Sequence, residues 1–261
     1  MKNYFIGAIV LTQLLLFVSC SSSDNDGFRL DSTSVALNAK AVGSNNQHQI
    51  SSNGSNLQYS SDDKYVATVS SAGLIESVCC GETTIHVTSE EGTADVAVKV
   101  QPKYQTYIEP SVDWSRTYSS MKSELGTSWI ESSDENYNIL TNISYDSKGD
   151  YCVYEFDKST QKLVCSWILV PTSYMDQAVY FVAERYLIQD IKKDYDALFI
   201  DNIDANKVKT LIALAAISDS YYGVAYISKA YANTASNLSV TGKASLLQSS
   251  MKKIVEHAFV K

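Results

Sequence analysis

The sequence predicts an all-β sandwich followed by an α+β domain, in which helices pack on one face of an antiparallel sheet. Three observations lead to this prediction. Residues 28–101 show short alternating strands between Ser, Asn, Gly and Asp turns, without a helical period. Pro102 marks a boundary, because proline cannot donate a hydrogen bond into a strand ladder. Residues 104–231 then combine helical periods with strand alternation, which is typical of an α+β domain.

The strands of the first domain are predicted to have one buried face. Val35 and Leu37 alternate with polar residues near the start of the domain. At its end, apolar residues recur with a period of two at Val96, Val98 and Val100. Alternate side chains of a strand point to the same side, so each of these sets belongs to a single face. Residues 70–73, Ser-Ser-Ala-Gly, are predicted to form a turn between two strands.

Three stretches of the first domain carry a family resemblance, and they are YSSDDKYVATV at 59–69, GLI at 73–75 and GETTIHV at 81–87. In this order, and with the later Gly92 and valine-rich strand, they resemble the bacterial immunoglobulin-like domain, group 2, over residues 28–101. The resemblance implies an Ig-like sandwich that serves as a spacer or as a binding module, with no catalytic residues. We favour the spacer, because a larger module follows the domain.

Two adjacent cysteines, Cys79 and Cys80, stand where this family usually has small or polar residues. Neighbouring side chains on an extended segment point to opposite faces, so the two thiols are not expected to share a metal. A disulfide between adjacent residues would also be strained. We therefore interpret them as turn residues of the sandwich.

The second domain is predicted to contain two helices and five strands. The first helix is capped by Asp113 or Ser115 and stopped by Gly126, and the second is capped by Ser173 with Asp176. Pro171 ends the sheet before the second helix. The predicted bounds are Arg116 to Leu125 and Ser173 to about Asp194 for the helices, and Tyr137 to Tyr145, Tyr151 to Asp157, Lys162 to Val170, Thr210 to Ile217 and Gly223 to Tyr231 for the strands.

The second domain is similar in pattern to C-terminal modules that follow group 2 Ig-like domains in other surface lipoproteins. Its helix followed by hairpins also faintly resembles β-lactamase-inhibitor proteins and barrel-assembly lipoproteins, which bind partners. Residues 232–261 are interpreted as a flexible connector and a C-terminal helix, with one apolar side formed by Leu247, Met251, Ile254 and Val255. We expect this helix to dock on its own domain, and the alternative is a detachable helix that engages a partner.

The first residues predict a lipoprotein signal peptide at 1–19 and a tether at 20–27. Lys2 is followed by an apolar run from Tyr4 to Val18 that is short for a bilayer span. The following Ser19-Cys20 resembles a bacterial lipobox, so Cys20 is the predicted lipidation site, and the alternative is an ordinary secretory signal cleaved elsewhere. Ser21, Asp24 and Asp26 resemble the sorting signals of Gram-negative lipoproteins. We therefore expect a lipid-anchored protein of the outer membrane that faces outward.

Charge and composition exclude several classes of function. Without Lys2 the chain has 20 basic and 29 acidic residues, and this net charge of −9 opposes binding to nucleic acid. The three histidines, His48, His86 and His257, do not have metal-ligand spacing. We expect no catalytic residues, no cofactor and no metal. The protein is accordingly predicted not to be an enzyme.

Two sets of side chains in the second domain are candidate sites. Aromatic residues near the domain junction and in the last hairpin could stack on a ligand, and they are Tyr104, Tyr107, Trp114, Tyr221 and Tyr222. Tyrosine is also simply a good strand former. Cys152 and Cys165 would lie opposite each other across a two-residue turn and could form a disulfide, whereas a shift of register would leave two buried thiols.

The predicted function is that of a lipid-anchored surface protein with a non-catalytic binding or adhesion module on an Ig-like spacer. The partner would be a glycan or an envelope protein. The alternatives are a carboxylate-dependent hydrolase in the α+β domain, or an accessory subunit of an envelope assembly. An exposed aromatic platform would favour the binding module, and a pocket with two facing carboxylates would favour the hydrolase. A dry apolar groove would favour the accessory subunit.

Overall fold

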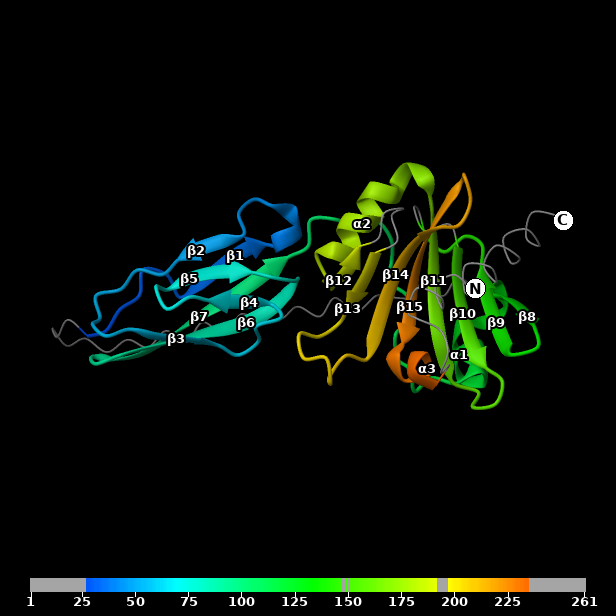
Figure 1. Ribbon diagram of the computed structural model, residues 1–261, viewed down its shortest axis with the longest axis horizontal. Coiled ribbons are helices and arrows are strands. Elements are labelled where there is room, and N and C mark those ends of the chain that lie inside the picture. The colour runs from blue at the N-terminus through cyan, green and yellow to red at the C-terminus, as the bar shows by residue number, and fades with distance from the viewer. Residues whose placement is uncertain (1–26, 147–148, 150, 192–196, 235–261) are drawn as a thin grey trace, which may run out of the picture.

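The computed structural model describes residues 27–146, 149, 151–191 and 197–234. The described chain forms two domains that follow each other along the longest axis of the molecule (Figure 1). Residues 27–101 are called the first domain and residues 102–234 the sheet domain. The predicted signal peptide, Cys20, most of the tether, and the chain beyond residue 234 lie outside the described residues.

The first domain is built from two small sheets. One has the order β1-β7-β6-β3, with β1 parallel to β7, and the other has the order β2-β5-β4. The described strands are β1 (Ser34–Asn38), β2 (Gln47–Gln49), β3 (Gln58–Ser61), β4 (Ala67–Val69), β5 (Leu74–Ser77), β6 (Gly81–Ser89) and β7 (Gly92–Gln101). Val96, Val98 and Val100 are at most 2% exposed, which confirms the buried face predicted from their period of two. They pack against Ile75 and Ile85 in the core of the domain.

The predicted turn at residues 70–73 lies between β4 and β5. Its backbone is closed by a hydrogen bond from the Gly73 N–H to the Ser70 carbonyl, at 3.0 Å. The Ser70 hydroxyl oxygen accepts a further bond from the Leu74 N–H. Gly73 has a φ of 80°, and a Cβ there would lie 2.7 Å from the Tyr59 hydroxyl oxygen. Both the backbone conformation and the lack of space therefore require glycine at this turn.

The sheet domain contains one large antiparallel sheet, whose described strands have the order β12-β13-β14-β15-β11-β10-β9-β8. Its strands are β8 (Ile130–Ser133), β9 (Tyr137–Asn142), β10 (Tyr151–Asp157), β11 (Leu163–Pro171), β12 (Leu187–Ile191), β13 (Ala197–Ile200), β14 (Thr210–Ala216) and β15 (Tyr221–Ser228). Its described helices are α1 (Tyr118–Leu125), α2 (Met175–Ala183) and the short α3 (Lys229–Thr234). Single turns of 3₁₀ helix occur at Lys40–Val42, Gly126–Ser128 and Thr172–Tyr174.

The sheet domain consists of two consecutive units, each a helix followed by a meander of four strands. The first unit is α1 with β8 to β11, and the second is α2 with β12 to β15. The helices start 57 residues apart, at Tyr118 and Met175, and the first strands also start 57 residues apart, at Ile130 and Leu187. The last strands of the units, β11 and β15, pair antiparallel in the middle of the sheet. The centre of the sheet is therefore the seam between two similar halves (Figure 1).

The two faces of the large sheet carry different layers. On the helix-covered face, Met121 of α1 and Phe181 of α2 pack on strand residues such as Phe156 and Tyr226. The second face bears Val153, Cys165, Trp167, Ala225 and Ile227. Both described helices of eight or more residues thus lie on one face, and the antiparallel sheet with helices agrees with the predicted architecture.

The predicted second helix is wrong in its C-terminal half. It ends at Ala183, and Leu187–Ile191 forms the strand β12 at the edge of the sheet. Strand β12 pairs antiparallel with β13, a strand that the sequence did not predict, as it did not predict β8. Tyr186 and Leu187 extend the helical period of α2, but a helix there would leave β13 paired on one side only, with β14. Pairing between distant residues therefore overrides the local period.

The sequence left two alternatives for Cys152 and Cys165, a disulfide or two buried thiols, and the structure has the second, because both thiols are free and fully buried. A two-residue turn would have set them opposite each other. The turn instead has four residues, 158–161, closed by a bond from the Asp157 N–H to the Lys162 carbonyl, and β10 has a bulge after Glu155. Cys152 consequently pairs with Ile168, three positions beyond Cys165. This odd shift places the two thiols on opposite faces of the sheet.

Candidate binding site at the domain junction

The two domains meet at the end of α2, where Glu184 and Arg185 hold both the linker and the first domain. The Glu184 carboxylate is fully buried and accepts the backbone N–H groups of Lys103 at 2.9 Å and Tyr104 at 3.0 Å. It also pairs with the Arg185 guanidinium at 2.6 Å. Hydrogen bonds to a charged acceptor are the stronger kind, so this carboxylate fixes the first residues of the linker.

The same two residues bind the first domain through their backbone carbonyls. The Glu184 carbonyl accepts the Cys80 N–H at 2.7 Å, and the Arg185 carbonyl accepts the Tyr65 hydroxyl at 2.6 Å. Burial raises the pKa of Cys79 to about 12 and that of Cys80 to about 11. Both thiols are therefore protonated and unreactive at neutral pH. The adjacent cysteines form part of the joint between the domains, where the Cys80 N–H binds the Glu184 carbonyl.

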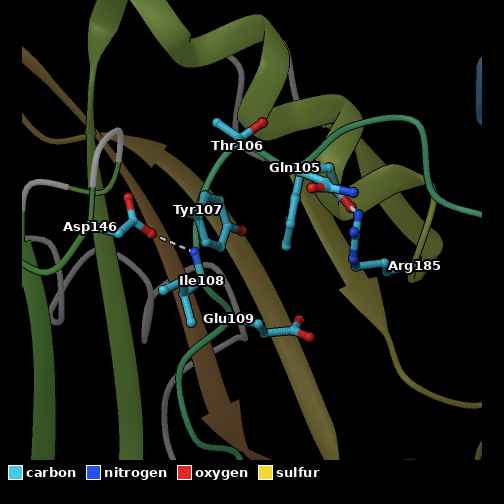
Figure 2. A pocket seen from close by; sticks show the side chains of 8 residues that line it. Gln105, Thr106, Tyr107, Ile108, Glu109, Asp146 and Arg185 are labelled. Carbon is cyan, nitrogen blue, oxygen red and sulfur yellow. Dashed lines mark hydrogen bonds between the residues drawn. The ribbon is translucent and has the colours of Figure 1, made fainter. Parts of the chain in front are cut away.

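Beside this joint lies an open cavity of about 410 Å³ (Figure 2). Its walls are the linker residues 105–109 together with Asp146, Phe181 and Arg185. In Figure 2 the linker crosses the view between Asp146 on one side and Arg185 on the other. The cavity thus brings together a cation, two carboxylates and two aromatic side chains from segments that are far apart in the sequence.

The charged groups around the cavity are held by bonds within the protein. Asp146 accepts the Ile108 N–H at 2.5 Å and the Gly149 N–H at 2.6 Å. Glu109 accepts the Tyr186 hydroxyl at 2.5 Å. Arg185 donates to the carbonyls of Phe181 and Tyr104, and its guanidinium carbon lies 3.7 Å from the Phe181 ring centroid. These partners fix the position of each charge, so the cavity has a rigid wall.

The lining of the cavity offers polar and apolar groups that a ligand could contact. No histidine, cysteine or serine is among the described residues that line it. Its two carboxylates already accept hydrogen bonds from the backbone or from Tyr186. Ile108 is 60% exposed and offers an apolar contact at the rim. A ligand with hydroxyl or amide groups and a small apolar face would match this surface.

The five aromatic residues predicted to stack on a ligand do not form one surface. Tyr107 and Tyr222 are buried, which contradicts that role for both. The Tyr107 hydroxyl lies 2.9 Å from that of Tyr226, and burial raises the pKa of both hydroxyls. These side chains face inward because the helix-covered face needs large rings beneath α2.

The other three candidates are half-buried and lie apart. Tyr104 stacks on Tyr180 with ring centroids 5.0 Å apart, and Trp114 donates its indole N–H to the Thr210 hydroxyl at 3.2 Å. Tyr221 lies on the opposite face of the sheet, edge-on to the Tyr151 ring. Of the predicted set, Tyr107 lines the cavity, and the half-buried Tyr104 adjoins it through its carbonyl, which accepts a hydrogen bond from Arg185.

The described part of the chain contains neither a metal-binding cluster nor a membrane-spanning helix. Within it, no three His, Cys, Asp or Glu side chains are grouped so that they could hold a metal ion. None of its helices is long and apolar enough to cross a bilayer. Of the histidines, His86 lies on the surface of the first domain between Asp95 at 2.7 Å and Asp62 at 2.8 Å. These two hydrogen bonds raise the pKa of His86.

Residues 26–100 match the family model of the bacterial Ig-like domain (group 2). The first domain is a bacterial Ig-like domain of group 2. The match agrees with the bounds 28–101 that the strand pattern and the quoted motifs predict. Ig-like domains of this group are typical of surface and envelope proteins. No curated protein matches the chain in sequence.

Apart from Tyr104 and Tyr107, the residues of the joint and of the cavity were not predicted as site residues. Glu184 and Arg185 form an ordinary acid–base pair at the end of an amphipathic helix, and such pairs are usually solvated. Asp146 stands in a polar segment that reads as a turn. The sequence signals at this place were the aromatic residues near the domain junction and the pair of cysteines that departs from the Ig-like pattern.

Proposed function

We propose that this protein is a lipid-anchored envelope protein of a Gram-negative bacterium, in which the Ig-like domain is a spacer and the sheet domain binds a partner. The partner is a glycan or a protein on the outside of the cell, and the protein performs no catalysis. The path of the chain through the Ig-like domain is the observation that carries this proposal.

The chain passes from one end of the Ig-like domain to the other. Phe28 lies against Gly92, where β7 begins, at the end far from the sheet domain (Figure 1). The ten residues of β7 then lead to Gln101 and the linker, a distance of roughly 33 Å. A tether at one end and a binding domain at the other is the arrangement that a spacer needs.

The joint supports the same function. Five hydrogen bonds of Glu184 and Arg185 connect the linker and the Ig-like domain to the end of α2. A flexible linker would let the sheet domain fold back toward the membrane. A fixed joint keeps it at a defined distance, which is useful only if something outside the membrane is to be reached.

The anchor is tested by replacing Cys20 with serine. In Gram-negative cells fed radioactive palmitate, the wild-type protein should become labelled and sediment with outer membranes, whereas Cys20→Ser should carry no label. Loss of two or three acyl chains removes about 0.8 kcal/mol per buried CH₂, so the variant should leave the membrane fraction. Protease added to intact cells should degrade the wild type if it faces outward. A wild-type protein without label would rule out the lipid anchor, and equal labelling of both forms would rule out Cys20 as its site.

The binding site is tested with two isoleucines of equal exposure. Ile108, at the rim of the cavity, and Ile203, in the loop before β14, are both 60% exposed. A glycan array and a pulldown from envelope extracts should identify the partner of the wild-type protein. Ile108→Asp should then weaken binding by roughly tenfold or more, because a charge would be desolvated at the contact. Ile203→Asp is the matched control and should bind like the wild type; equal loss in both variants would exclude the cavity.

The carboxylate-dependent hydrolase is the rival that this cavity favours, because Glu109 and Asp146 both line it. Incubation of the wild-type protein with every ligand that the array identifies should leave the ligand intact. A cleavage product that Glu109→Gln abolishes would establish the hydrolase instead. In that case the protein would still be an anchored envelope protein, but with an enzyme at the end of its spacer.

A further inference from the structure

The second face of the large sheet is apolar and withdrawn from solvent. Val153, Trp167 and Ala225 at its centre are at most 1% exposed. Leu169 and Ile227 beside them are equally inaccessible, at 1% and 2%. A sheet face of this composition is not stable against water, so it must be covered by another layer.

The described residues do not supply that layer. Apart from Ala232 of α3, the described members of this cluster come from the strands or from residues next to strand ends, such as Val208 and Ile217. Helices α1 and α2 lie on the other face. The short α3 follows β15 directly and places Ala232 in the cluster, so the chain leaves the described part of the molecule at the second face.

A buried polar pair lies within this apolar face. Glu155 is 1% exposed, and neither of its carboxylate oxygens has a hydrogen-bond partner. The indole N–H of the fully buried Trp167 is also without a partner. The charged groups near Glu155 among the described residues include Asp134, which has the same sign. The covering layer should therefore not bring a further carboxylate.

The last 27 residues of the chain, 235–261, have the composition that this face requires. They contain four lysines and one acidic residue, Glu256, whereas the whole chain has a net charge of −8. Leu247, Met251, Ile254 and Val255 form one side of a predicted helix. Glu256 follows Leu247 by nine positions, which is about 180° around a helix, so it would point away from the sheet.

We propose that residues 243–259 form a helix that docks through Leu247, Met251, Ile254 and Val255 on the second face, over Val153, Cys165 and Trp167. The sheet domain is then a sheet between two helical layers, and its second face is an internal surface of the protein. This inference does not depend on the proposed function.

The lengths agree with this arrangement. Residues 235–242 can span at most about 28 Å when extended, which is enough to pass from the end of α3 across half of the sheet. A helix of residues 243–259 is about 25 Å long, close to the width of five strands at about 4.8 Å each. The four central strands, β14, β15, β11 and β10, carry the most deeply buried residues of the face.

Two native thiols allow a direct test. Cys165 lies on the second face and Cys152 on the helix-covered face, and both are fully buried. Met251→Asp places a charge in the middle of the proposed contact, and Ser249→Asp places the same charge on the solvent side of the helix. Labelling with N-ethylmaleimide, followed by peptide mass spectrometry, gives the rate at each thiol in the full chain and in a form that starts at Cys20.

In Met251→Asp the labelling of Cys165 should become roughly tenfold faster or more relative to Cys152, because the helix detaches locally while the opposite layer stays in place. Ser249→Asp should label like the wild type. Unchanged Cys165 labelling in Met251→Asp would overturn the proposal, and so would equal acceleration at both thiols, which would indicate general unfolding. A synthetic peptide of residues 242–261, added to a chain ending at residue 241, should restore protection of Cys165 alone.

Other covers of this face would give different results. If the apolar residues 4–18 covered it, Cys165 would be protected in the full chain and exposed in the form that starts at Cys20. If a second copy covered it, Cys165 labelling would slow with increasing protein concentration, and light scattering would report a dimer. Either result would overturn the proposal.

Discussion

Replacing Glu155 with glutamine should make the protein more stable at pH 8 and leave its stability at pH 4.5 almost unchanged. Burial, and then the charge on Asp134, raise the pKa of Glu155 to about 8, while the nearby Trp167 indole lowers it by a smaller amount without meeting hydrogen-bond geometry. Between pH 4.5 and 8 the folded protein therefore keeps a proton that the unfolded chain releases. Wild-type stability must fall as the pH rises through this window and level off above it.

The size of this effect follows from the two pKa values. The rise of the Glu155 pKa from the ordinary 4.5 to about 8 corresponds to a loss of at most roughly 5 kcal/mol in the free energy of unfolding. Cys165, Tyr137 and Tyr231 also face Glu155, but their pKa values are raised as well, so they stay neutral in this range. Urea unfolding at pH 5, 6.5 and 8 measures the slope of the free energy of unfolding against pH. The exposed Glu135→Gln is the control, and a Glu155→Gln variant with the wild-type slope would show that the carboxyl is not buried.

Replacing Glu184 with alanine should loosen the joint between the domains and destabilise the sheet domain. The substitution leaves the N–H groups of Lys103 and Tyr104 without their acceptor and Arg185 without its counter-charge. Breaking a buried pair by removing one partner costs about 3–5 kcal/mol. We expect the linker to become sensitive to limited proteolysis, and small-angle scattering should show a broader range of distances between the domains.

Two further variants separate the joint from general stability. Tyr65→Phe removes only the hydroxyl that bonds to the Arg185 carbonyl and should cost about 1 kcal/mol, with increased linker cleavage and an intact fold. The exposed Glu90→Ala should change neither property. If Glu184→Ala left linker cleavage at the wild-type rate, the joint would have to be held by other contacts.

The candidate cavity could not be predicted because the segments that line it are far apart in the sequence. Gln105 to Glu109 come from the linker, Asp146 from the turn after β9, and Arg185 from the end of α2. Each of these stretches reads as ordinary solvated chain. The predicted aromatic residues near the junction were partly a correct indication, since Tyr107 lines the cavity, but its hydroxyl faces Tyr226 in the core.

The adjacent cysteines show how a departure from a family pattern can point to a contact. The sequence indicated that Cys79 and Cys80 were unusual for the Ig-like domain, and it excluded a shared metal. It could not indicate that the Cys80 N–H binds the Glu184 carbonyl of a different domain. Small hydrophobic side chains suit a turn that is buried against a neighbour, and this is the physical reason for the departure.

The sequence by itself determined the Ig-like domain, because its turns and alternating valines act over a few residues and recur in a fixed order. It also determined β10 and the position where β11 ends at Pro171, since alternation and proline are local signals. Only the tertiary structure decided that the chain after Ala183 is a strand, that Cys152 and Cys165 face apart, and that Glu184 joins the two domains. These features depend on strand pairing, register and burial between residues far apart in the chain, which a local pattern does not contain.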